Sequence, residues 1–221
     1  MNGTTATIRE QARYDRQARW YDFAVSPMET LAFLGLRRRL WLTVNGPRLL
    51  EIGVGTGRNL KYYPVASRVV ALDLSPRMLK RAVAKAARAG QSVDFLLADT
   101  QHLPFRDGVF DTVLATLVFC SVPDPVRGLA EGGRVARPEG HVVLLEHGRA
   151  ANSLLGKIMD GLNRITSRSG EHINRDTAAG LREAGLEILA EERYRLGIVK
   201  LLRAKPSSGA SRKGEDNGVA S

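Results

Sequence analysis

The chain has 221 residues, of which 43% are hydrophobic and 25% are charged, and its formal net charge is +10. The length and composition are ordinary for one globular domain, while the single cysteine, Cys120, excludes an intramolecular disulfide and a thiolate zinc cluster and favours a reducing compartment. The positive charge predicts attraction to an anionic partner, whether nucleic acid, an acidic lipid surface or an acidic small molecule.

The polar N-terminal sequence MNGTTATIREQARYDRQ lacks the apolar stretch of a signal peptide. The longest apolar run, Val113 to Val122, has about half the length of a membrane-spanning helix. Together with the cysteine count, these features predict a cytoplasmic protein, and they leave peripheral contact with the inner membrane face open.

Residues 1–45 are expected to form a helical cap that precedes the sheet. If Thr7 to Val25 is one helix, one face carries Arg9, Arg13, Arg16 and Trp20 and the opposite face carries Tyr14, Ala18, Tyr21 and Val25. A second segment, LAFLGLRRRLWL, mixes large apolar residues with three arginines, residues 37–39. Two interpretations stay open, namely a cap with solvated arginines, or a basic amphipathic element that meets an anionic membrane or covers the substrate pocket.

Residues 46–205 alternate short β-branched runs with helical patterns. Strands are expected at Arg48–Gly53, Arg68–Leu74, Val93–Ala98, Phe110–Thr116 and His141–Glu146. Helices are expected near Gly57–Tyr62, Pro76–Ala89, Pro125–Ala136 and Arg175–Ala184. This alternation predicts an α/β fold in which a mostly parallel sheet carries helices on both faces.

The C-terminal part departs from this alternation. Glu187–Tyr194 and Ile198–Ala204 are two strand-like runs joined by a short link, so they predict an antiparallel hairpin that completes a seven-stranded sheet at its edge. The last residues, PSSGASRKGEDNGVAS (206–221), are small and polar and are expected to be a disordered tail.

A glycine-rich loop follows the first expected strand in LLEIGVGTGRNL. Glycines permit unusual backbone angles and let a ligand touch the main chain, and a helix that begins after them offers free N–H groups to an anionic or polar group. The spacing is G-x-G-x-G, because Arg58 stands where the dinucleotide fingerprint needs its third glycine. Tight packing is the structural alternative for such glycines.

Acidic residues stand near the ends of the expected strands. Glu51 precedes the glycine loop, Asp73 ends the second strand and Asp99 follows the third. Ligands of open parallel sheets bind at the carboxyl ends of the strands, so these carboxylates are expected to meet in one crevice, where Asp73 can accept both hydroxyls of a ribose.

The motifs EIGVGTGRN, VVALDLSPRML, LLADTQHLPF, FDTVLATLVFCSV and ARPEGHVVLLEH, in this order, resemble the class I S-adenosylmethionine-dependent methyltransferases. Within that superfamily the pattern is similar to the branch with ubiquinone/menaquinone, phosphatidylethanolamine and lipophilic-thiol methyltransferases. The N-terminal YDRQARWYDFAVSPME resembles the Tyr-Asp element that these enzymes place over the cofactor. The resemblance implies a Rossmann-like fold over about residues 49–146 and S-adenosylmethionine as the cofactor.

The resemblance also implies roles for single positions. The methionine part of the cofactor would lie against Gly53, Gly55 and Gly57, with Glu51 as support and Asn59 beside the loop. Asp73 would hold the ribose hydroxyls, and Leu74 or Met78 would lie against the adenine. Asp99 would face the adenine amino group, with Thr100 beside it. The segment from Ala115 to Val118, which contains Thr116, would pass beneath the cofactor, and Tyr14 and Tyr21 would cover it.

An ammonium acceptor must lose a proton before it can attack the methyl group, and a thiol or phenol likewise reacts as its anion, so a base is expected. The candidates are His147, after the fifth strand, His172, in SGEHINRDT, and Tyr21. Their structural alternatives are a strand cap, a solvated loop residue and a packing residue of the lid. Cys120 is expected to be a small buried hydrophobe. No metal-ligand spacing appears in the sequence, so no metal is predicted.

The acceptor is expected to be a lipophilic small molecule, and the basic N-terminal segments favour phosphatidylethanolamine or a related amino lipid. A quinone or a thiol is the nearest alternative. The charge also permits RNA or DNA modification, but the Asn/Asp-Pro-Pro-aromatic signature of base amino methylation is absent after the fourth strand, which ends in ATLVFCS, so nucleic acid is disfavoured. A regulator that binds the cofactor without turnover and a nicotinamide oxidoreductase remain alternatives, and the oligomeric state is left open.

Overall fold

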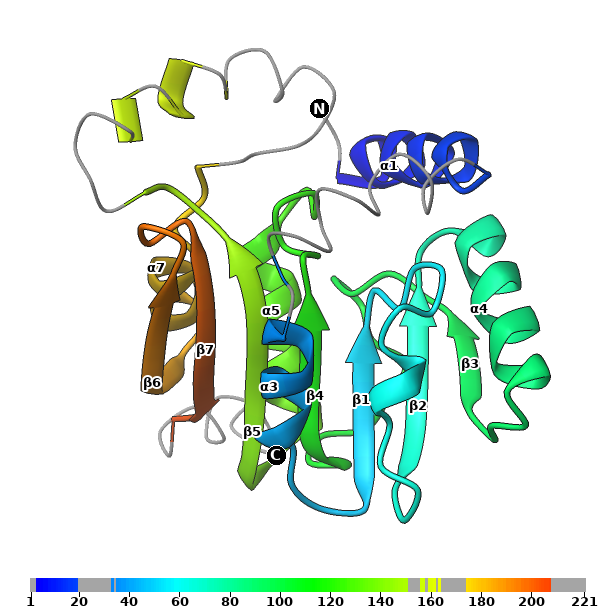
Figure 1. Ribbon diagram of the computed structural model, residues 1–221. Coiled ribbons are helices and arrows are strands. Elements are labelled where there is room, and N and C mark those ends of the chain that lie inside the picture. Colours follow the sequence, from blue (N-terminus) through cyan, green and yellow to red (C-terminus); the bar gives the residue numbers. More distant parts are fainter. Residues whose placement is uncertain are drawn as a thin grey trace, which may run out of the picture.

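The computed structural model describes residues 3–19, 33, 35–150, 156–157, 159–161, 163 and 174–207. Its centre is a seven-stranded sheet in the order β3-β2-β1-β4-β5-β7-β6 (Figure 1). The strands are β1 (Arg48–Ile52), β2 (Arg68–Asp73), β3 (Asp94–Leu97), β4 (Phe110–Thr116), β5 (Ala136–His147), β6 (Leu186–Tyr194) and β7 (Val199–Pro206). The first five strands pair in parallel and β7 pairs antiparallel with both β5 and β6, which confirms the predicted α/β class and the edge hairpin.

Three helices begin with the sequence signals that define helix N-termini. They are α4 (Pro76–Arg88), α5 (Pro125–Val135) and α7 (Thr177–Glu183). The side chains of Ser75, Asp124 and Asp176 each accept a hydrogen bond from a backbone N–H of the first turn. A proline also stands in the first turn of α4 and of α5, where its missing N–H costs nothing.

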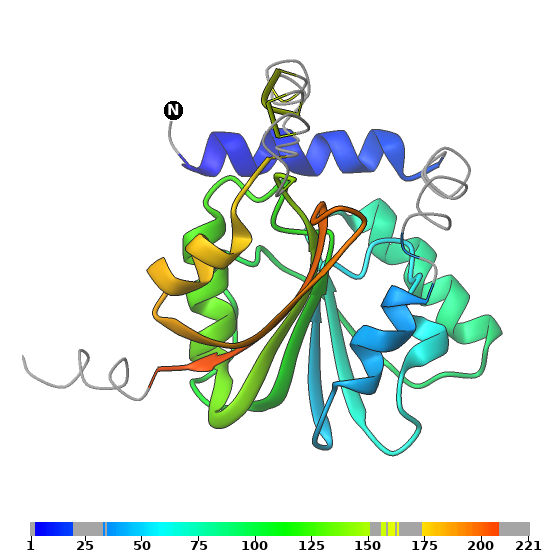
Figure 2. The ribbon, with the colours of Figure 1, turned by 60° about the vertical axis from the view of Figure 1, so that its left-hand side comes forward.

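Helices cover both faces of the sheet, and alternate residues of β2 show which helix lies on which face. Val70 and Leu72 belong to the apolar cluster that includes Leu129 of α5 and Leu181 of α7. Val69 packs with the short helix α3 (Leu36–Leu42), and Ala71 packs with α4. Figure 2 accordingly shows α5 and α7 on one side of the sheet and α3 and α4 on the other.

Helix α1 (Gly3–Gln17) crosses the carboxyl ends of the strands (Figures 1 and 2). The Thr7 hydroxyl donates to the Asp99 carboxylate at 3.3 Å, and the Asp15 carboxylate accepts from the Ser75 hydroxyl at 2.5 Å and from the Arg77 N–H at 3.2 Å. The helix begins before the expected Thr7, and the expected residues 20–25 lie outside the described part of the chain.

Two predicted elements differ from the structure. The helix expected at Gly57–Tyr62 is only a 3-10 turn, η1 (Leu60–Tyr62), because Gly57 adopts a φ of +76°. The fifth strand begins at Ala136, which pairs with Phe110, whereas the prediction began it at His141. A register shift between Phe110 and Thr112 separates this first pair from the regular ladder, so residues 137–140 form an irregular start that the alternation pattern did not indicate.

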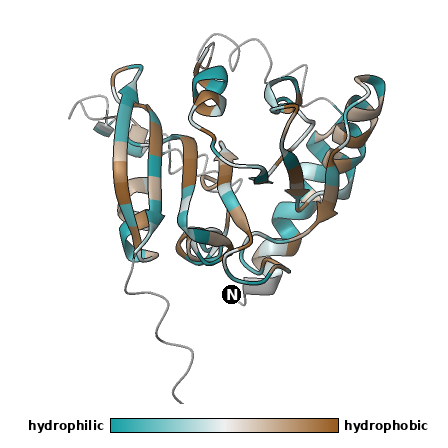
Figure 3. Cartoon of the chain, turned by 90° about the horizontal axis from the view of Figure 1, so that it is seen from below, coloured by the Kyte–Doolittle hydropathy of each residue, from teal (hydrophilic) through white to brown (hydrophobic). Residues whose placement is uncertain are grey.

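The hydropathy of the strands follows their place in the sheet. The central strands are mostly hydrophobic, whereas the hairpin strands at the edge alternate between hydrophilic and hydrophobic residues (Figure 3). Strand β4 is buried at nearly every position, as expected for a parallel strand covered on both faces. None of the helices within the described ranges is long and apolar enough to cross a bilayer. Residues 208–221, which contain most of the expected tail, lie outside these ranges.

Candidate active site

A pocket opens at the carboxyl ends of β1, β2 and β4, beneath α1. Most of the predicted cofactor residues line it, namely Tyr14, Glu51, Gly53, Gly55, Asn59, Asp73, Leu74, Met78, Asp99, Thr100 and Thr116. Its further walls include Glu10, Arg37, Arg58, Leu117, Val118, Ser121, Val122 and Pro123. The structure therefore brings together groups from six separate segments of the sequence, within residues 10–14, 37, 51–59, 72–78, 98–100 and 116–123.

The three glycines after β1 have different neighbours, although all have a positive φ. A Cβ at Gly53 would lie 2.4 Å from a methyl of Val118, and one at Gly57 would lie 2.6 Å from Leu60 and 3.2 Å from the backbone of Ala82. A Cβ at Gly55 would meet nothing within 4 Å. Packing therefore accounts for Gly53 and Gly57, the second of which does not line the pocket, whereas Gly55 presents bare backbone to the pocket.

Asp73 ends β2 and is fixed by main-chain groups. Its two carboxylate oxygens accept from the N–H of Gly55 and the N–H of Ser75, each at 2.8 Å. Burial raises the pKa of Asp73 above its ordinary value, although these hydrogen bonds oppose the rise. Each oxygen can accept further bonds, so a carboxylate held in this way presents a fixed pair of acceptors to two neighbouring hydroxyls.

Glu51 lies at the end of β1 within a network of side chains. One oxygen accepts from the Asn59 amide at 2.7 Å, and the other accepts from the Tyr63 hydroxyl. The Asn59 amide also donates to the Thr116 hydroxyl at 3.0 Å. Glu51 is 1% exposed, and this burial raises its pKa from 4.5 to about 7, while Tyr63, Asn59 and Arg37 oppose the rise. Glu51 can therefore hold a proton near neutral pH.

Arg37 extends this network to α3 and was missed as a site residue by the sequence analysis. Its guanidinium donates to the Asn59 side-chain oxygen at 2.9 Å, and the residue lines the pocket. It precedes the buried Leu40 and Trp41 by three and four positions, which places it on the packed face of the helix. Arg38 is exposed and Arg39 pairs with Glu192 at 2.8 Å, whereas Arg37 lines the pocket, so the three arginines have different surroundings.

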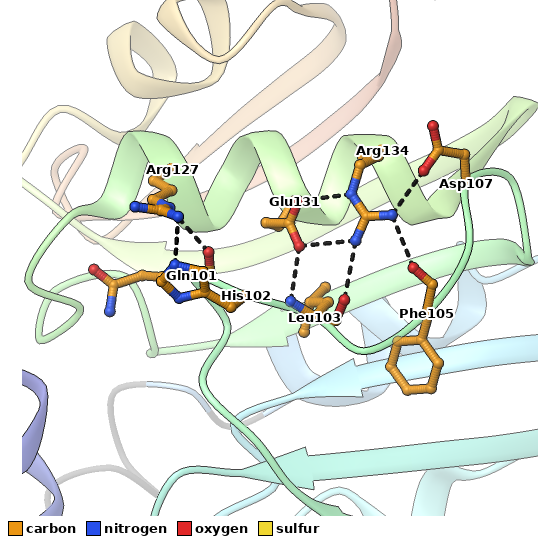
Figure 4. Close-up of polar contacts among 8 residues, drawn as sticks. All are labelled: Gln101, His102, Leu103, Phe105, Asp107, Arg127, Glu131 and Arg134. Carbon is orange, nitrogen blue, oxygen red and sulfur yellow. Dashed lines mark hydrogen bonds and ion pairs between the residues drawn. The ribbon is translucent and has the colours of Figure 1, made fainter. Parts of the chain in front are cut away.

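Asp99 and Thr100 reach the pocket from the loop after β3. Asp99 accepts from the backbone N–H of Gln101 at 2.9 Å in addition to its contact with Thr7. The rest of this loop is tied to α5, as Figure 4 shows. Arg134 donates to the carbonyl oxygens of Leu103 and Phe105 and to the Asp107 carboxylate. These contacts fix the loop on which Asp99 and Thr100 stand.

The loop after β4 forms another wall and is held by a second buried glutamate, Glu146. One of its oxygens accepts from the N–H of Val118 at 2.8 Å and from the N–H of Phe119 at 3.0 Å. These bonds follow Leu117, which adopts a φ of +57°. Arg175 donates to the carbonyl oxygens of Phe119 and Val122 at 2.6 Å each and closes the same turn from the other side.

The predicted bases are not brought together in the described part of the pocket. His147 pairs with Val199 in the sheet ladder and does not line the pocket, while His172 and Tyr21 lie outside the described residues. Cys120 is buried, as expected. No group of three or more His, Cys, Asp or Glu side chains within the described ranges is placed to hold a metal ion.

The residues of the pocket fit an adenosyl cofactor with a charged methionine end. The bare backbone at Gly55 leaves room for close approach, Asp73 offers two fixed acceptors for a ribose, and Leu74, Met78 and Ala98 offer an apolar surface for a planar base. A sulfonium cofactor of this type supplies an electrophilic methyl group when it is bound. The chain's own contribution is alignment and exclusion of water, which can supply about 7–11 kcal/mol of the barrier reduction.

Comparisons with known proteins agree with this fit. A family model described as "Methyltransferase domain" matches residues 50–144. The chain is 35% identical over 160 residues to a phosphatidylethanolamine N-methyltransferase of Cereibacter sphaeroides, with 70% of this chain and 77% of the relative covered. It is 29% identical over 222 residues to the mitochondrial methyltransferase OMS1 of Saccharomyces cerevisiae, with 91% of this chain covered, and it spans only 47% of that relative. A solved structure from Thermotoga maritima, described as a SAM-dependent methyltransferase, is 21% identical and superposes with a TM-score of 0.70 over 89% of this chain and 99% of that one.

Proposed function

The chain belongs to the class I S-adenosylmethionine-dependent methyltransferases, and within this family we propose that it methylates the amine of a phospholipid of the phosphatidylethanolamine type. The observation that carries this proposal is the similarity to a phosphatidylethanolamine N-methyltransferase, because the chain covers 77% of that relative. An apolar wall of the pocket, formed by Leu117, Val118, Val122 and Pro123, supports a lipophilic acceptor.

In this proposal Asp73 binds the ribose hydroxyls, and Gly55 lets the methionine end of the cofactor approach the backbone. Asp99 and Thr100 border the adenine. Tyr14, whose ring lies 4.7 Å from the Arg13 guanidinium, covers the cofactor from α1 and excludes water. Tyr21, which lies outside the described residues, is proposed to share this role.

The acceptor amine must be neutral when it attacks, so its proton has to leave before or during transfer. Glu51 lines the pocket with a pKa of about 7, whereas His147 stands outside it, so Glu51 is the described group best placed to hold a proton there. His172 remains a proposed base, and it lies on a segment outside the described ranges. On this proposal the protein works at the cytoplasmic face of a membrane.

The test is incubation of the full chain with radiolabelled S-adenosylmethionine and a mixture of phosphatidylethanolamine, a demethylated quinone, an alkyl thiol and RNA. We expect the label in the phospholipid pool. Label confined to the quinone, thiol or RNA pool would overturn the acceptor assignment and leave the family assignment intact. A parallel reaction with Asp73→Ala controls for transfer outside the pocket, because that variant lacks the ribose-binding carboxylate.

A further inference from the structure

Helix α4 carries five cations and no acidic residue within its 13 residues. Because an α-helix turns by about 100° per residue, the cations fall on one face, opposite the buried residues of the helix. The exposed face carries Arg77, Lys80, Arg81, Lys85 and Arg88, and the buried face carries Met78, Ala82 and Ala86. Within the described part of the chain, Arg77, Lys80 and Arg88 form no ion pair. Helix α4 itself contributes no acidic side chain to this face, and Asp15 of α1 lies at its start.

The β6–β7 hairpin shows the usual alternative, in which charges of both signs are interleaved. Glu187 pairs with Lys205 at 3.2 Å and Glu191 pairs with Arg193 at 2.8 Å. On α4, by contrast, cations stand three and four positions apart and repel one another, which destabilises the helix. If an anionic surface contacts this face, it attracts each of the cations, and this attraction offsets the repulsion between them.

The end of α1 continues the basic surface above α4. Asp15 bonds to Ser75 and to the Arg77 N–H at the start of α4, and the next residue, Arg16, is exposed. Two large apolar side chains are also exposed on these helices, Val83 at 43% on α4 and Ile8 at 59% on α1, about two turns before Arg16. We call Arg16, Arg77, Lys80 and Arg88 the basic face.

We propose that the basic face docks the protein on an anionic lipid bilayer. Charge complementarity supports an anionic partner, and the exposed Ile8 and Val83 can enter the interfacial region of a bilayer. A single-stranded nucleic acid would call for aromatic stacking platforms, and the exposed residues of α1 and α4 within the described ranges include no aromatic side chain.

Docking through this face would bring the pocket close to the lipid. Met78 in the first turn of α4 lines the pocket, and the preceding residue, Arg77, is exposed, so the basic face begins next to the pocket wall. The inference rests on the proposed function, because only an acceptor that resides in the bilayer gives this placement a use.

The test is sedimentation of the full chain with vesicles of phosphatidylcholine, either alone or mixed with phosphatidylglycerol, at rising salt. We expect binding to the mixed vesicles that is lost between about 0.1 M and about 1 M salt, where the Debye length shrinks from about 10 Å to about 3 Å. The triple variant Arg77→Gln/Lys80→Gln/Arg88→Gln should bind about a hundredfold more weakly, at about fivefold per cation removed. Glutamine has a helix propensity similar to that of Arg and Lys, and the relief of repulsion should keep the unfolding temperature equal or higher.

The matched control is Arg48→Gln/Arg106→Gln/Arg182→Gln, which removes three exposed cations that lie away from α4, at the start of β1, on the loop before β4 and on α7. Its binding should stay within about twofold of the parent chain, because charges beyond about 10 Å from the lipid are screened. Equal losses in both triple variants, equal binding to both kinds of vesicle, or a preference for single-stranded RNA that the α4 variant abolishes would each overturn the proposal. The assay needs no turnover, so a failure of the acceptor assignment would appear only in the labelling experiment.

Discussion

The carboxyl ends of β1 and β5 each bury a glutamate, but the two side chains are held in different ways. Glu51 and Glu146 are each 1% exposed, and burial raises the pKa of each to about 7. Glu51 is held by the side chains of Asn59 and Tyr63. Glu146 is held by the main-chain N–H groups of Val118 and Phe119.

The two glutamates lose similar hydration on burial, but their partners give them different structural roles. Glu51 organises a side-chain network that reaches Arg37 at the pocket, whereas Glu146 fixes the backbone of one pocket wall. Asp73 combines the two arrangements, because main-chain N–H groups hold it while it faces the pocket. The partners of a buried carboxylate, and not its burial, indicate what it does.

The largest effect is expected for Asp73, the carboxylate with a main-chain anchor and a pocket position. Asp73→Ala removes the acceptors assigned to two ribose hydroxyls, and each charge-assisted bond contributes about 1.5–3 kcal/mol. Cofactor affinity should therefore fall by at least about a hundredfold, as measured by titration calorimetry.

The fold of that variant should persist, which thermal unfolding checks. Asp73→Asn is the matched substitution, because it keeps the size of the side chain and one oxygen that can accept from the Gly55 or Ser75 N–H. Unchanged affinity in Asp73→Ala would show that the ribose is held elsewhere.

The second effect is a loss of stability with rising pH that both glutamates should share. Since burial raises the pKa of each from 4.5 to about 7, the folded state holds the proton more tightly than the unfolded chain does. Their contribution to stability is fully present below about pH 4.5 and is lost as the pH rises through about 7. The loss is about 3 kcal/mol for each group.

Each contribution is measured by denaturant unfolding across this pH range, with the parent chain, Glu51→Gln and Glu146→Gln compared. Each glutamine variant should lack the part of the pH dependence of the unfolding free energy that its glutamate contributes. The neighbouring charges are Arg37 and Asp73 for Glu51 and Arg175 for Glu146. If the pH dependence of the unfolding free energy became weaker in only one of the two glutamine variants, burial would not affect the two carboxyls equally, and the comparison between them would fail.

Much of the fold and part of the site follow from sequence pattern, because strands and caps are local. The β-branched runs of β1, β2 and β4 and their alternation with helical patterns predict where the carboxyl ends of the strands meet, and Asp73 and Asp99 do line the pocket there.

The sequence pattern could not predict contacts between residues that are far apart in the sequence. Glu146 bonds to main-chain N–H groups 27 and 28 residues away, and no side-chain motif records such a contact. The three glycines look alike in the sequence, and only their packing distinguishes Gly55 from Gly57. Arg37 did leave a signal, since its spacing from Leu40 and Trp41 places it on the packed face of α3.

A third effect should distinguish the main-chain anchor from the side-chain anchor. Glu146→Ala leaves the N–H groups of Val118 and Phe119 without their acceptor, and main-chain groups cannot rotate to new partners. In Glu51→Ala the side chains of Asn59 and Tyr63 can reorient toward one another. At each position the loss is measured as the unfolding free energy of the Gln variant minus that of the Ala variant. This loss should be about 2 kcal/mol larger at Glu146 than at Glu51. Equal losses by urea unfolding would mean that the loop after β4 finds other acceptors.

The smallest effect tests whether the Glu51 network reaches α3. Arg37→Met keeps a long apolar stem on the packed face of the helix but removes the guanidinium that donates to Asn59, so it should cost about 1 kcal/mol of unfolding free energy. Arg38→Met is the matched control on the same helix, where an exposed side chain should change stability by less than about 0.5 kcal/mol. The stability of Arg37→Met should also depend more on pH near 7 than that of the parent chain does. The Arg37 charge opposes the raised pKa of Glu51, so its loss moves the titration of folded Glu51 to higher pH, and the folded state then keeps its proton where the unfolded chain has lost it. If the two variants behaved alike, the network would end at Asn59, and α3 would contribute only its apolar contacts to the pocket.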